Sequence, residues 1–500
     1  MGYFGGAPPG AGRRWTTNHG TKWKCRALGN NQPAPRLGRP TRLLPCAPLA
    51  ETLAPFQSSN MRAIHSFFAI GGLLIAASAA PCLGQPGDRL SLELRDFGRN
   101  ARTDAGWSAW AQREEIQPKC FVDTVHFRSA PDALAISGNG NPAEYGGWAY
   151  PVNGIRAGQY YRLTAFYRAQ AVPDERRQVV ARIDWLDNLG RRVGQPDYAY
   201  QASADGDWTR VTLLVPAPLQ AARARIELSL GWAPLGTVWW DDITFEEAQP
   251  PPPRWVRVGT VSLHPRSNPD NLGAFLQALD RIARDRPDIV CLGEELLLEG
   301  TSRPYVGAAE PIPGPSTGRL GEKARRYGMY IVAGLTERDG PVVYNTAVLI
   351  DRHGNVAGRY RKVNLPREEI EGGVTPGGAY PVFDTDFGKI GLMICWDGEY
   401  VDPARAMAIQ GAEILFVPAA GGYLTLLKAR ALENHLYVVS SGFDVESAII
   451  DPTGMVLFST MDSGVDKTMA VNLEDRFMDP WLGDMRARFH KEIRRDIPMP

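Results

Sequence analysis

Hydrophobic and polar positions follow different periods in the two halves of the chain. From about Asp88 to Glu247, short runs of aromatic and β-branched residues are separated by turn residues. Several runs alternate polar with apolar, as in Arg225-Ile226-Glu227-Leu228-Ser229-Leu230. A period of two is typical of half-buried strands, and no later segment of this half has a helical period, so the pattern predicts an all-β sandwich. We expect strands at 161–167, 179–186, 208–215, 225–230 and 238–245.

The pattern changes after Gln249, where Pro250 to Pro253 form a stiff, extended segment that predicts a domain boundary. Beyond it, strand-like runs alternate with helical periods, which predicts an α/β domain with helices covering the faces of a sheet. Strands are expected at 256–263, 288–292, 330–335, 345–351, 389–395, 413–418, 437–442 and 447–450, and helices near 272–283, 319–327, 403–410 and 425–435.

One long apolar run, Phe67 to Ala80, lies behind Met61 and Arg62. At about 14 residues it is too short to span a membrane and suits the core of a signal peptide. Cleavage is expected before Ala80 or before Gln85, and a lipid-anchored Cys82 or a buried helix are the alternatives. An exported protein follows, located in the periplasm, in the cell envelope or outside the cell.

These patterns divide the chain into six parts. Residues 1–60 are rich in Gly, Pro and Arg and lack periodicity, which indicates a non-native or disordered extension ahead of a true start at Met61. The other parts are a signal peptide (61–84), a β-sandwich accessory domain (88–248), a Pro-rich linker (249–254), the α/β domain (255–475) and a C-terminal tail (476–500).

Composition narrows the classes of function. The 55 basic residues balance the 55 acidic ones among 500 residues, so no basic excess favours nucleic acid as a partner. Six cysteines are too few for a disulfide scaffold. The seven histidines are scattered and no HExxH or CxxC spacing occurs, which argues against a metal hydrolase, and we expect no cofactor.

Three reactive side chains stand at or just after predicted strands of the α/β domain, where such sheets usually place their sites. Glu294 follows the strand at 288–292, Lys362 follows the strand that ends at Asp351, and Cys395 ends the strand at 389–395. Taken one at a time, each has an ordinary explanation, since a Cys at the end of a buried strand is usually a small hydrophobe and a Lys or Glu in a loop is usually solvated.

In this order and context, the three motifs resemble the nitrilase superfamily, the carbon–nitrogen hydrolases with a Glu-Lys-Cys triad. The likeness runs from Arg257 to about Asn472 and includes 345–351, 431–434 and 451–454. It implies a four-layer α-β-β-α sandwich, assembled as a dimer or larger oligomer through the helix after the cysteine.

The resemblance also implies a role for each residue. Cys395 is the nucleophile, Glu294 the general base, and Lys362 stabilises the oxyanion with the backbone N–H of Trp396. A second glutamate, which positions the substrate or the lysine, is expected a few residues after Lys362. Glu371 fits best by its distance to Pro376-Gly377, and Glu369 is the fallback.

Two positions depart from the family pattern: Gly293 stands where proline is common, and Asn364 where histidine is common. Nitrile-cleaving members usually carry Cys-Trp-Glu, whereas this chain reads Cys395-Trp396-Asp397-Gly398, closer to amidases and carbamoylases. The resemblance therefore implies a hydrolase of an amide or N-carbamoyl substrate, acting through a thioester and releasing ammonia or an amine.

The sandwich resembles the jelly-roll, carbohydrate-binding-type modules found beside glycan-active enzymes, most clearly in its closing segment 236–243. Its aromatic side chains either stack on sugar rings or fill the core; the candidates are Trp107, Trp110, Tyr145, Trp148 and Tyr150. If Trp107, Trp148 and Tyr150 are buried, they cannot form a glycan platform. A catalytically silent, exported glycan- or envelope-binding protein is the alternative to an enzyme.

A papain-type cysteine hydrolase is a further alternative, and it would need a histidine base. His264, His353 and His435 are available after the linker, but none lies in a recognisable pairing motif.

Overall fold

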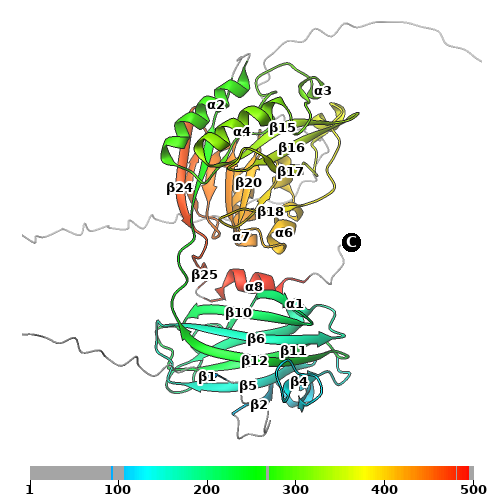
Figure 1. Ribbon diagram of the computed structural model, residues 1–500, viewed down its shortest axis with the longest axis vertical. Helices are drawn as coiled ribbons and strands as arrows, with labels where there is room; N and C mark the ends of the chain where they lie inside the picture. Colours follow the sequence, from blue (N-terminus) through cyan, green and yellow to red (C-terminus); the bar gives the residue numbers. More distant parts are fainter. Residues whose placement is uncertain (1–91, 94–105, 266–269, 480, 495–500) are drawn as a thin grey trace, which may run out of the picture. The chain divides into compact units, whose positions relative to one another are not determined.

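The computed structural model describes residues 92–93, 106–265, 270–479 and 481–494 (Figure 1). The predicted extension, the signal peptide and both candidate cleavage sites lie outside these residues. Within the described part, no helix is both long enough and apolar enough to cross a membrane.

Two antiparallel sheets make up the first part of the described chain. One follows the order β3-β4-β12-β6-β10-β9, with β1 paired to β12, and the other follows β2-β5-β11-β7-β8. The elements are β1 (Leu92–Glu93), β2 (Ser108–Ala111), η2 (Glu114–Ile116), β3 (Lys119–Asp123), β4 (Ala133–Ser137), β5 (Tyr145–Asn153), β6 (Tyr160–Gln170), α1 (Glu175–Gln178), β7 (Val179–Leu186), β8 (Asp197–Tyr198), β9 (Gln201–Asp205), β10 (Trp208–Pro216), β11 (Arg223–Gly231) and β12 (Thr237–Ala248). All five strands expected from the alternation are present.

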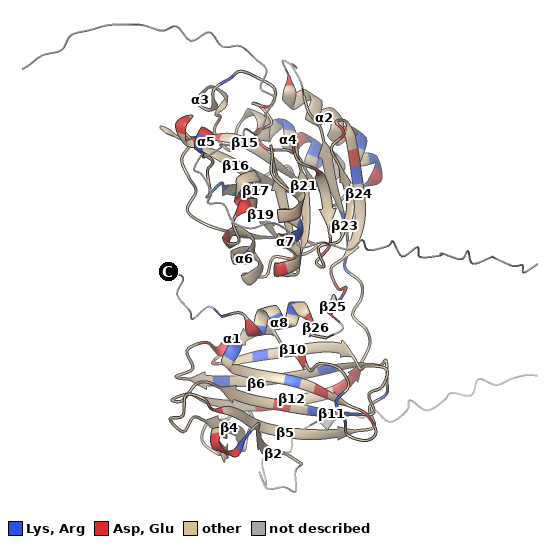
Figure 2. Cartoon of the chain, turned by 180° about the vertical axis from the view of Figure 1, so that it is seen from behind, with Lys and Arg blue, Asp and Glu red and all other residues tan. Residues whose placement is uncertain are grey.

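A single hydrophobic core lies between these two sheets, and strand β11 shows how the alternation builds it. Ile226, Leu228 and Leu230 enter the core. On the other face of the strand, Arg225 and Glu227 belong to an ion-pair network with the β7 residues Arg182 and Asp184. Figure 2 shows basic and acidic segments interspersed along β6, β11 and β12.

The aromatic residues proposed as a glycan platform divide into two groups. Trp107 and Trp148 are buried in the core, and Tyr150 packs against it, so these three do not form a sugar-binding surface. Trp110 and Tyr145 are half-buried, with ring centroids 6.0 Å apart, and Tyr145 also packs on the exposed Trp232 at 5.2 Å.

The second part of the chain contains two six-stranded sheets. The first sheet has the order β17-β16-β15-β14-β13-β24, and the second has the order β18-β19-β20-β21-β22-β23. Their strands are β13 (Trp255–Ser262), β14 (Ile289–Cys291), β15 (Tyr330–Asp339), β16 (Val342–Ile350), β17 (Val356–Arg361), β18 (Val382–Asp384), β19 (Lys389–Leu392), β20 (Ile414–Pro418), β21 (Tyr437–Ser441), β22 (Ser447–Ile450), β23 (Val456–Thr460) and β24 (Val465–Asn472). In each sheet, three neighbouring strands pair in parallel and the outer strands pair antiparallel.

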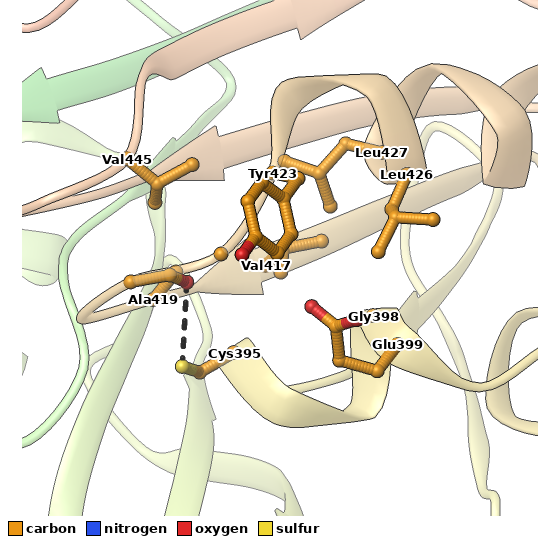
Figure 3. A pocket seen from close by; sticks show the side chains of 11 residues that line it. Cys395, Gly398, Glu399, Val417, Ala419, Tyr423, Leu426, Leu427 and Val445 are labelled. Carbon is orange, nitrogen blue, oxygen red and sulfur yellow. Dashed lines mark hydrogen bonds between the residues drawn. The ribbon is translucent and has the colours of Figure 1, made fainter. Parts of the chain in front are cut away.

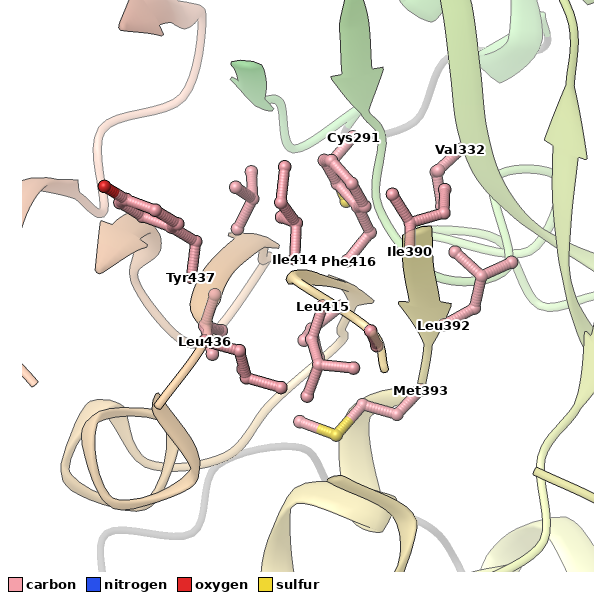
Figure 4. Packing of buried hydrophobic residues seen from close by; sticks show 14 of the residues in the cluster. Cys291, Val332, Ile390, Leu392, Met393, Ile414, Leu415, Phe416, Leu436 and Tyr437 are labelled. Atoms are coloured by element: carbon pink, nitrogen blue, oxygen red, sulfur yellow. The ribbon is translucent and has the colours of Figure 1, made fainter. Parts of the chain in front are cut away.

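The two sheets share one core (Figure 4). Cys291 and Val332 of the first sheet meet Ile390, Ile414 and Phe416 of the second. Two hydroxyls also bridge the sheets, because Thr260 donates to the carbonyl of Ser440 and Ser441 donates to the carbonyl of Val261, each at 2.6 Å. These bonds satisfy polar groups that would otherwise be costly to bury.

Helices flank the sheets. Helices α2 (Asn271–Ile282) and α4 (Pro315–Tyr327) pack on the first sheet, and α6 (Asp402–Ile409) and α7 (Leu424–Asn434) pack on the second. The remaining helical elements are η3 (Ala283–Asp285), α3 (Tyr305–Ala308), α5 (Arg367–Glu371) and η4 (Cys395–Glu399). The segment expected to be a C-terminal tail contains the hairpin β25 (Met478–Asp479) and β26 (Gly483–Asp484) and the helix α8 (Met485–Glu492).

Candidate active site

Glu294 is held in a buried position just after strand β14. Its side chain is 2 % exposed. Oε1 accepts hydrogen bonds from Nδ2 of Asn345 at 2.7 Å and from Nζ of Lys362 at 2.9 Å, and Oε2 accepts from the backbone N–H of Ala420 at 2.6 Å. These three donors fix the orientation of the carboxylate.

Two glycines let the backbone around Glu294 pack closely. A Cβ on Gly293 would lie 2.6 Å from the ring of Phe443, and a Cβ on Gly334 of β15 would lie 2.6 Å from the Cα of Glu294. The N–H of Gly334 also donates to the carbonyl of Gly293 at 3.0 Å. The ring of Phe443 therefore leaves little room for a side chain at position 293. This packing fixes the backbone that carries Glu294.

Lys362 comes directly after strand β17 and points between two carboxylates. Its ammonium is fully buried and contacts Glu294 and Glu369. Burial alone would lower the pKa of Lys362, but the charges of Glu294, Cys395 and Glu369 outweigh it and raise the pKa above its usual value. The lysine is therefore a fixed positive charge beside Glu294.

Of the two candidate supporting glutamates, Glu369 contacts Lys362, whereas the preferred Glu371 lies away from it. Glu369 is 4 % exposed; it contacts Lys362 through Oε1 and accepts from Asn345 Nδ2 at 3.3 Å through Oε2. Glu371 is exposed and pairs with Arg367 at 2.7 Å. Both residues belong to the short helix α5, in which residues two apart point in nearly opposite directions.

Cys395 begins the turn η4 that follows strand β19. Its φ is +42°, a left-handed conformation that is uncommon for a residue with a side chain. Asp397, two residues later, holds this turn and is itself fully buried. Its carboxylate accepts from Tyr360 Oη at 2.7 Å, from the Asn364 N–H at 2.9 Å and from the Ile394 N–H at 3.1 Å. These bonds offset the strain at Cys395.

The thiol of Cys395 meets opposing electrostatic influences. Burial and the charge of Glu294 raise its pKa to about 12, while the charge of Lys362 lowers it. Sγ lies 3.4 Å from the carbonyl oxygen of Gly421, which accepts its hydrogen bond. The resting group is therefore a thiol rather than a thiolate at neutral pH.

Glu294 and Cys395 converge on two consecutive residues of the loop after strand β20. Glu294 binds the N–H of Ala420, and Cys395 binds the carbonyl of Gly421. A buried carboxylate and a thiol thus face the same short stretch of backbone, with a lysine beside the carboxylate. This arrangement can move a proton from sulfur to a carboxylate oxygen while the sulfur attacks a carbonyl carbon.

A small cavity of about 10 Å³ lies beside Cys395 (Figure 3). Val417, Leu427 and Val445 supply apolar wall, and Glu399 and Tyr423 supply polar groups. The space is close to the minimum that one water molecule needs.

The other predicted positions have different surroundings. Trp396 follows Cys395 with its side chain 39 % exposed. Asn364, where the family commonly has histidine, donates to Asp397 through both its backbone and its side chain. Among the described residues, no hydrogen bond joins Cys395 to a histidine, and no group of His, Cys, Asp and Glu side chains is arranged to hold a metal ion.

Several residues of the site were missed by sequence reasoning. Asn345 touches both glutamates, Asp397 anchors the cysteine turn, and Glu295 follows Glu294 with φ +45° and one buried carboxylate oxygen without a hydrogen-bond partner among the described residues. Burial and the charges of Glu294 and Glu369 raise the pKa of Glu295. A polar Asn345 inside an otherwise apolar strand was the one signal in the sequence that could have marked such a position.

Comparisons with known proteins agree on one part of the chain. Residues 257–473 match the family model of the carbon-nitrogen hydrolases. A probable nitrilase of Schizosaccharomyces pombe is 35 % identical over 162 residues, which cover 29 % of this chain and 59 % of that protein. The omega-amidase of Mus musculus is 27 % identical over 256 residues, which cover 46 % of this chain and 88 % of that protein. The chain thus spans less than two thirds of the yeast protein.

Among solved structures, the chain is similar to an amidase of the nitrilase superfamily from Nesterenkonia AN1. It has a TM-score of 0.39 and 24 % identity and covers 45 % of this chain and 93 % of its own. A carbon-nitrogen hydrolase from Helicobacter pylori has a TM-score of 0.38 and 23 % identity, covering 44 % and 90 %. On the match of the family model, residues 257–473 hold a carbon-nitrogen hydrolase domain of the nitrilase superfamily.

Proposed function

We propose that this domain is a cysteine-dependent hydrolase of non-peptide carbon–nitrogen bonds, with a small amide or N-carbamoyl compound as substrate. The observation that carries the proposal is the convergence of Glu294 and Cys395 on Ala420 and Gly421, with Lys362 bound to the same glutamate. Curated relatives named as an omega-amidase and a nitrilase support carbon–nitrogen bond hydrolysis.

In the first half of the reaction, the sulfur of Cys395 attacks the carbonyl carbon while its proton passes to Glu294. The proton must leave during the attack, because the raised pKa of the thiol keeps it protonated beforehand. Lys362 and the backbone N–H of Trp396 stabilise the negative oxygen of the tetrahedral intermediate. Glu294 then returns the proton to the nitrogen, the carbon–nitrogen bond breaks, and ammonia or an amine leaves an acyl thioester on Cys395.

In the second half, Glu294 accepts a proton from a water molecule whose oxygen attacks the thioester carbon. The carbon–sulfur bond breaks, sulfur regains a proton from Glu294, and a carboxylic or carbamic acid is released. Glu369 acts as a positioning residue in both halves, since it holds the ammonium of Lys362 together with Glu294.

An amide or N-carbamoyl compound is favoured over a nitrile. The motif Cys395-Trp396-Asp397 supports this choice, because nitrile-cleaving members of the family usually carry Cys-Trp-Glu. Tyr360 and Asn364 bind the carboxylate of Asp397 inside the protein, so Asp397 shapes the cysteine turn.

The test is ammonia release by the full chain from a panel of amides, N-carbamoyl compounds and nitriles. We expect release from the first two classes, lost in Cys395→Ala by on the order of 10⁴-fold or more. Cys120→Ala, which removes a partly buried thiol of the β-sandwich, is the matched control and should retain full activity. Release that survives in Cys395→Ala would contradict the proposal.

Further parts of the proposal concern architecture and setting. The two sheets with flanking helices support the four-layer α-β-β-α arrangement, and the two antiparallel sheets around one core support a jelly-roll accessory domain. We also propose a homo-oligomer, supported by the exposed apolar Leu432 and Met455 near α7.

We further propose that the protein is exported, and the apolar run at 67–80 is the one feature that supports this.

Carbohydrate binding by the sandwich stays a prediction. The proposed platform no longer supports it, because Trp107 and Trp148 are buried and Tyr150 packs against the core. The alternative of a catalytically silent glycan-binding protein is disfavoured by the ordered, buried geometry of Glu294, Lys362 and Cys395, which such a protein would not need.

A further inference from the structure

The carboxylate of Glu399 faces the cavity beside Cys395 without a partner from the protein. Glu399 is the last residue of η4 and lines the same small space as the thiol, below Tyr423 in Figure 3. Among the described residues, no hydrogen bond or ion pair reaches its side chain; its backbone carbonyl alone is bound, by Arg430 at 3.3 Å. The side chain is partly exposed and has no counterion from the described residues, so its carboxylate is open to pair with a cationic group of a bound ligand.

Arg430 and Arg405 pair with Glu433 and not with Glu399. Nη1 of Arg430 binds Glu433 at 2.8 Å, and its Nε binds the carbonyl of Gly398 at 3.2 Å. Arg405 also lies 3.9 Å from Glu433. Arg430 binds the backbone carbonyls of Gly398 and Glu399, but both arginines pair with Glu433, so neither neutralises the carboxylate of Glu399.

The rest of the site adds negative rather than positive charge. The ammonium of Lys362 lies between Glu294 and Glu369 and is shared by both carboxylates. A substrate that carried its own carboxylate would therefore meet Glu399 with no cation to offset the repulsion. Leu426, Leu427 and Val417 line the cavity beside Glu399, and an apolar wall strengthens a charge interaction next to it.

We propose that Glu399 selects substrates that carry a primary ammonium group in addition to the amide or carbamoyl group that is cleaved. This inference rests on the proposed function, since it names the substrate class of the same site. The volume of about 10 Å³ beside Glu399 suits a group the size of one water molecule, such as an ammonium. Glu399 is a specificity-determining residue and takes no part in bond cleavage.

The experiment compares kcat/KM for three matched sets of compounds of increasing chain length: ω-amino amides, fatty amides and ω-carboxy amides. The wild-type chain should favour the best ω-amino amide over its fatty counterpart by about tenfold or more, which corresponds to about 1.4 kcal/mol. Glu399→Gln should remove this preference while leaving fatty amides within about twofold. The preference should also weaken as salt is raised, since one partner is only partly buried.

Glu371→Gln is the matched control, because it makes the same change at an exposed glutamate that pairs with Arg367. It should keep the preference for ω-amino amides unchanged. Equal losses for ω-amino and fatty amides in Glu399→Gln would overturn the inference, and so would a wild-type preference for ω-carboxy amides.

A binding measurement separates this inference from the proposed function. Titration calorimetry with Cys395→Ala should show tighter binding of ω-amino amides than of fatty amides, and the double variant Cys395→Ala/Glu399→Gln should lose the difference. Cys395-dependent hydrolysis of fatty amides without an ammonium preference would leave the proposed function standing and refute the role of Glu399. Hydrolysis that does not depend on Cys395 would refute the proposed function, and the calorimetric difference would still decide the role of Glu399.

Discussion

The ammonium of Lys362 lies 2.9 Å from Oε1 of Glu294, and both side chains are almost completely removed from solvent. Glu369 contacts the same ammonium from another side. In such a group each charge depends on the others, because an unpaired ion in the protein interior is strongly unfavourable. The groups proposed to carry out the reaction therefore also affect the stability of the fold.

Replacing Lys362 by Met should lower the free energy of unfolding by about 3–5 kcal/mol at pH 7, because two buried carboxylates lose their counterion. Lys362 lowers the pKa of Glu369, so its removal raises that pKa further. A carboxyl whose folded-state pKa is raised stabilises the fold below its unfolded pKa, and this contribution is lost as pH rises through the folded pKa. The deficit of Lys362→Met relative to wild type should therefore shrink between pH 7 and pH 5 in denaturant titrations. A deficit that stays constant over this range would show that the carboxylates are not buried together.

The thiol of Cys395 should alkylate slowly near neutral pH, since its pKa is raised to about 12 by burial and by Glu294. The rate constant for iodoacetamide should keep rising through pH 9 without a plateau near 8.5, the usual pKa of a cysteine. In Glu294→Gln the repulsive charge is gone, so the pKa of the thiol should fall and alkylation at pH 8 should become faster. A background in which Cys25, Cys46, Cys82 and Cys120 are all replaced by Ala leaves Cys395 as the reactive thiol, because Cys291 is fully buried. A plateau at the usual pKa in the wild-type chain would contradict this assignment.

Glu369→Gln should reduce kcat by on the order of 10²-fold through misplacement of Lys362, with a smaller effect on KM. Glu371→Gln should remain within about twofold of wild type, because that side chain is exposed and bound to Arg367. Measuring both variants on one amide substrate distinguishes the two glutamates directly. The reverse pattern would place the supporting role on Glu371 after all.

Gly293→Ala should destabilise the fold by about 1–3 kcal/mol, since the new Cβ would lie 2.6 Å from the ring of Phe443. Phe443→Leu removes the edge of that ring and should restore part of the loss in the double variant. Thermal unfolding of the two single variants and the double variant measures the coupling. Strictly additive effects would show that the ring does not restrict residue 293.

The regular elements could be predicted largely from periodicity. The alternation in 225–230 and the helical spacing of Leu272, Phe275 and Leu279 both correspond to elements of the structure, β11 and α2. Strands β17 and β24 were missed, because Val356–Arg361 and Val465–Asn472 are half-exposed edge strands whose composition resembles that of loops.

Less of the candidate site than of the fold could be predicted from the sequence. The structure brings Glu294, Lys362 and Cys395 to one place, which motif order anticipated. The choice between Glu369 and Glu371 depends on the phase of a five-residue helix, which spacing in the sequence does not define. The part played by Ala420 is invisible in the sequence because it acts through its backbone N–H. Glu399 was overlooked because its position depends on how η4 turns after Cys395.

The buried carboxylate of Asp397 links the two sheets of the hydrolase domain. It sits in the turn after β19 of the second sheet, and it is bound by Tyr360 of β17 and by Asn364 just after β17, in the first sheet. The cysteine turn and the lysine segment therefore cannot separate without exposing this acid and breaking several bonds at once. Opening at the nucleophile is thus coupled to parting of the sheets, so the amide hydrogens of Ile394 and Asn364, which donate to Asp397, should exchange only when the whole domain unfolds.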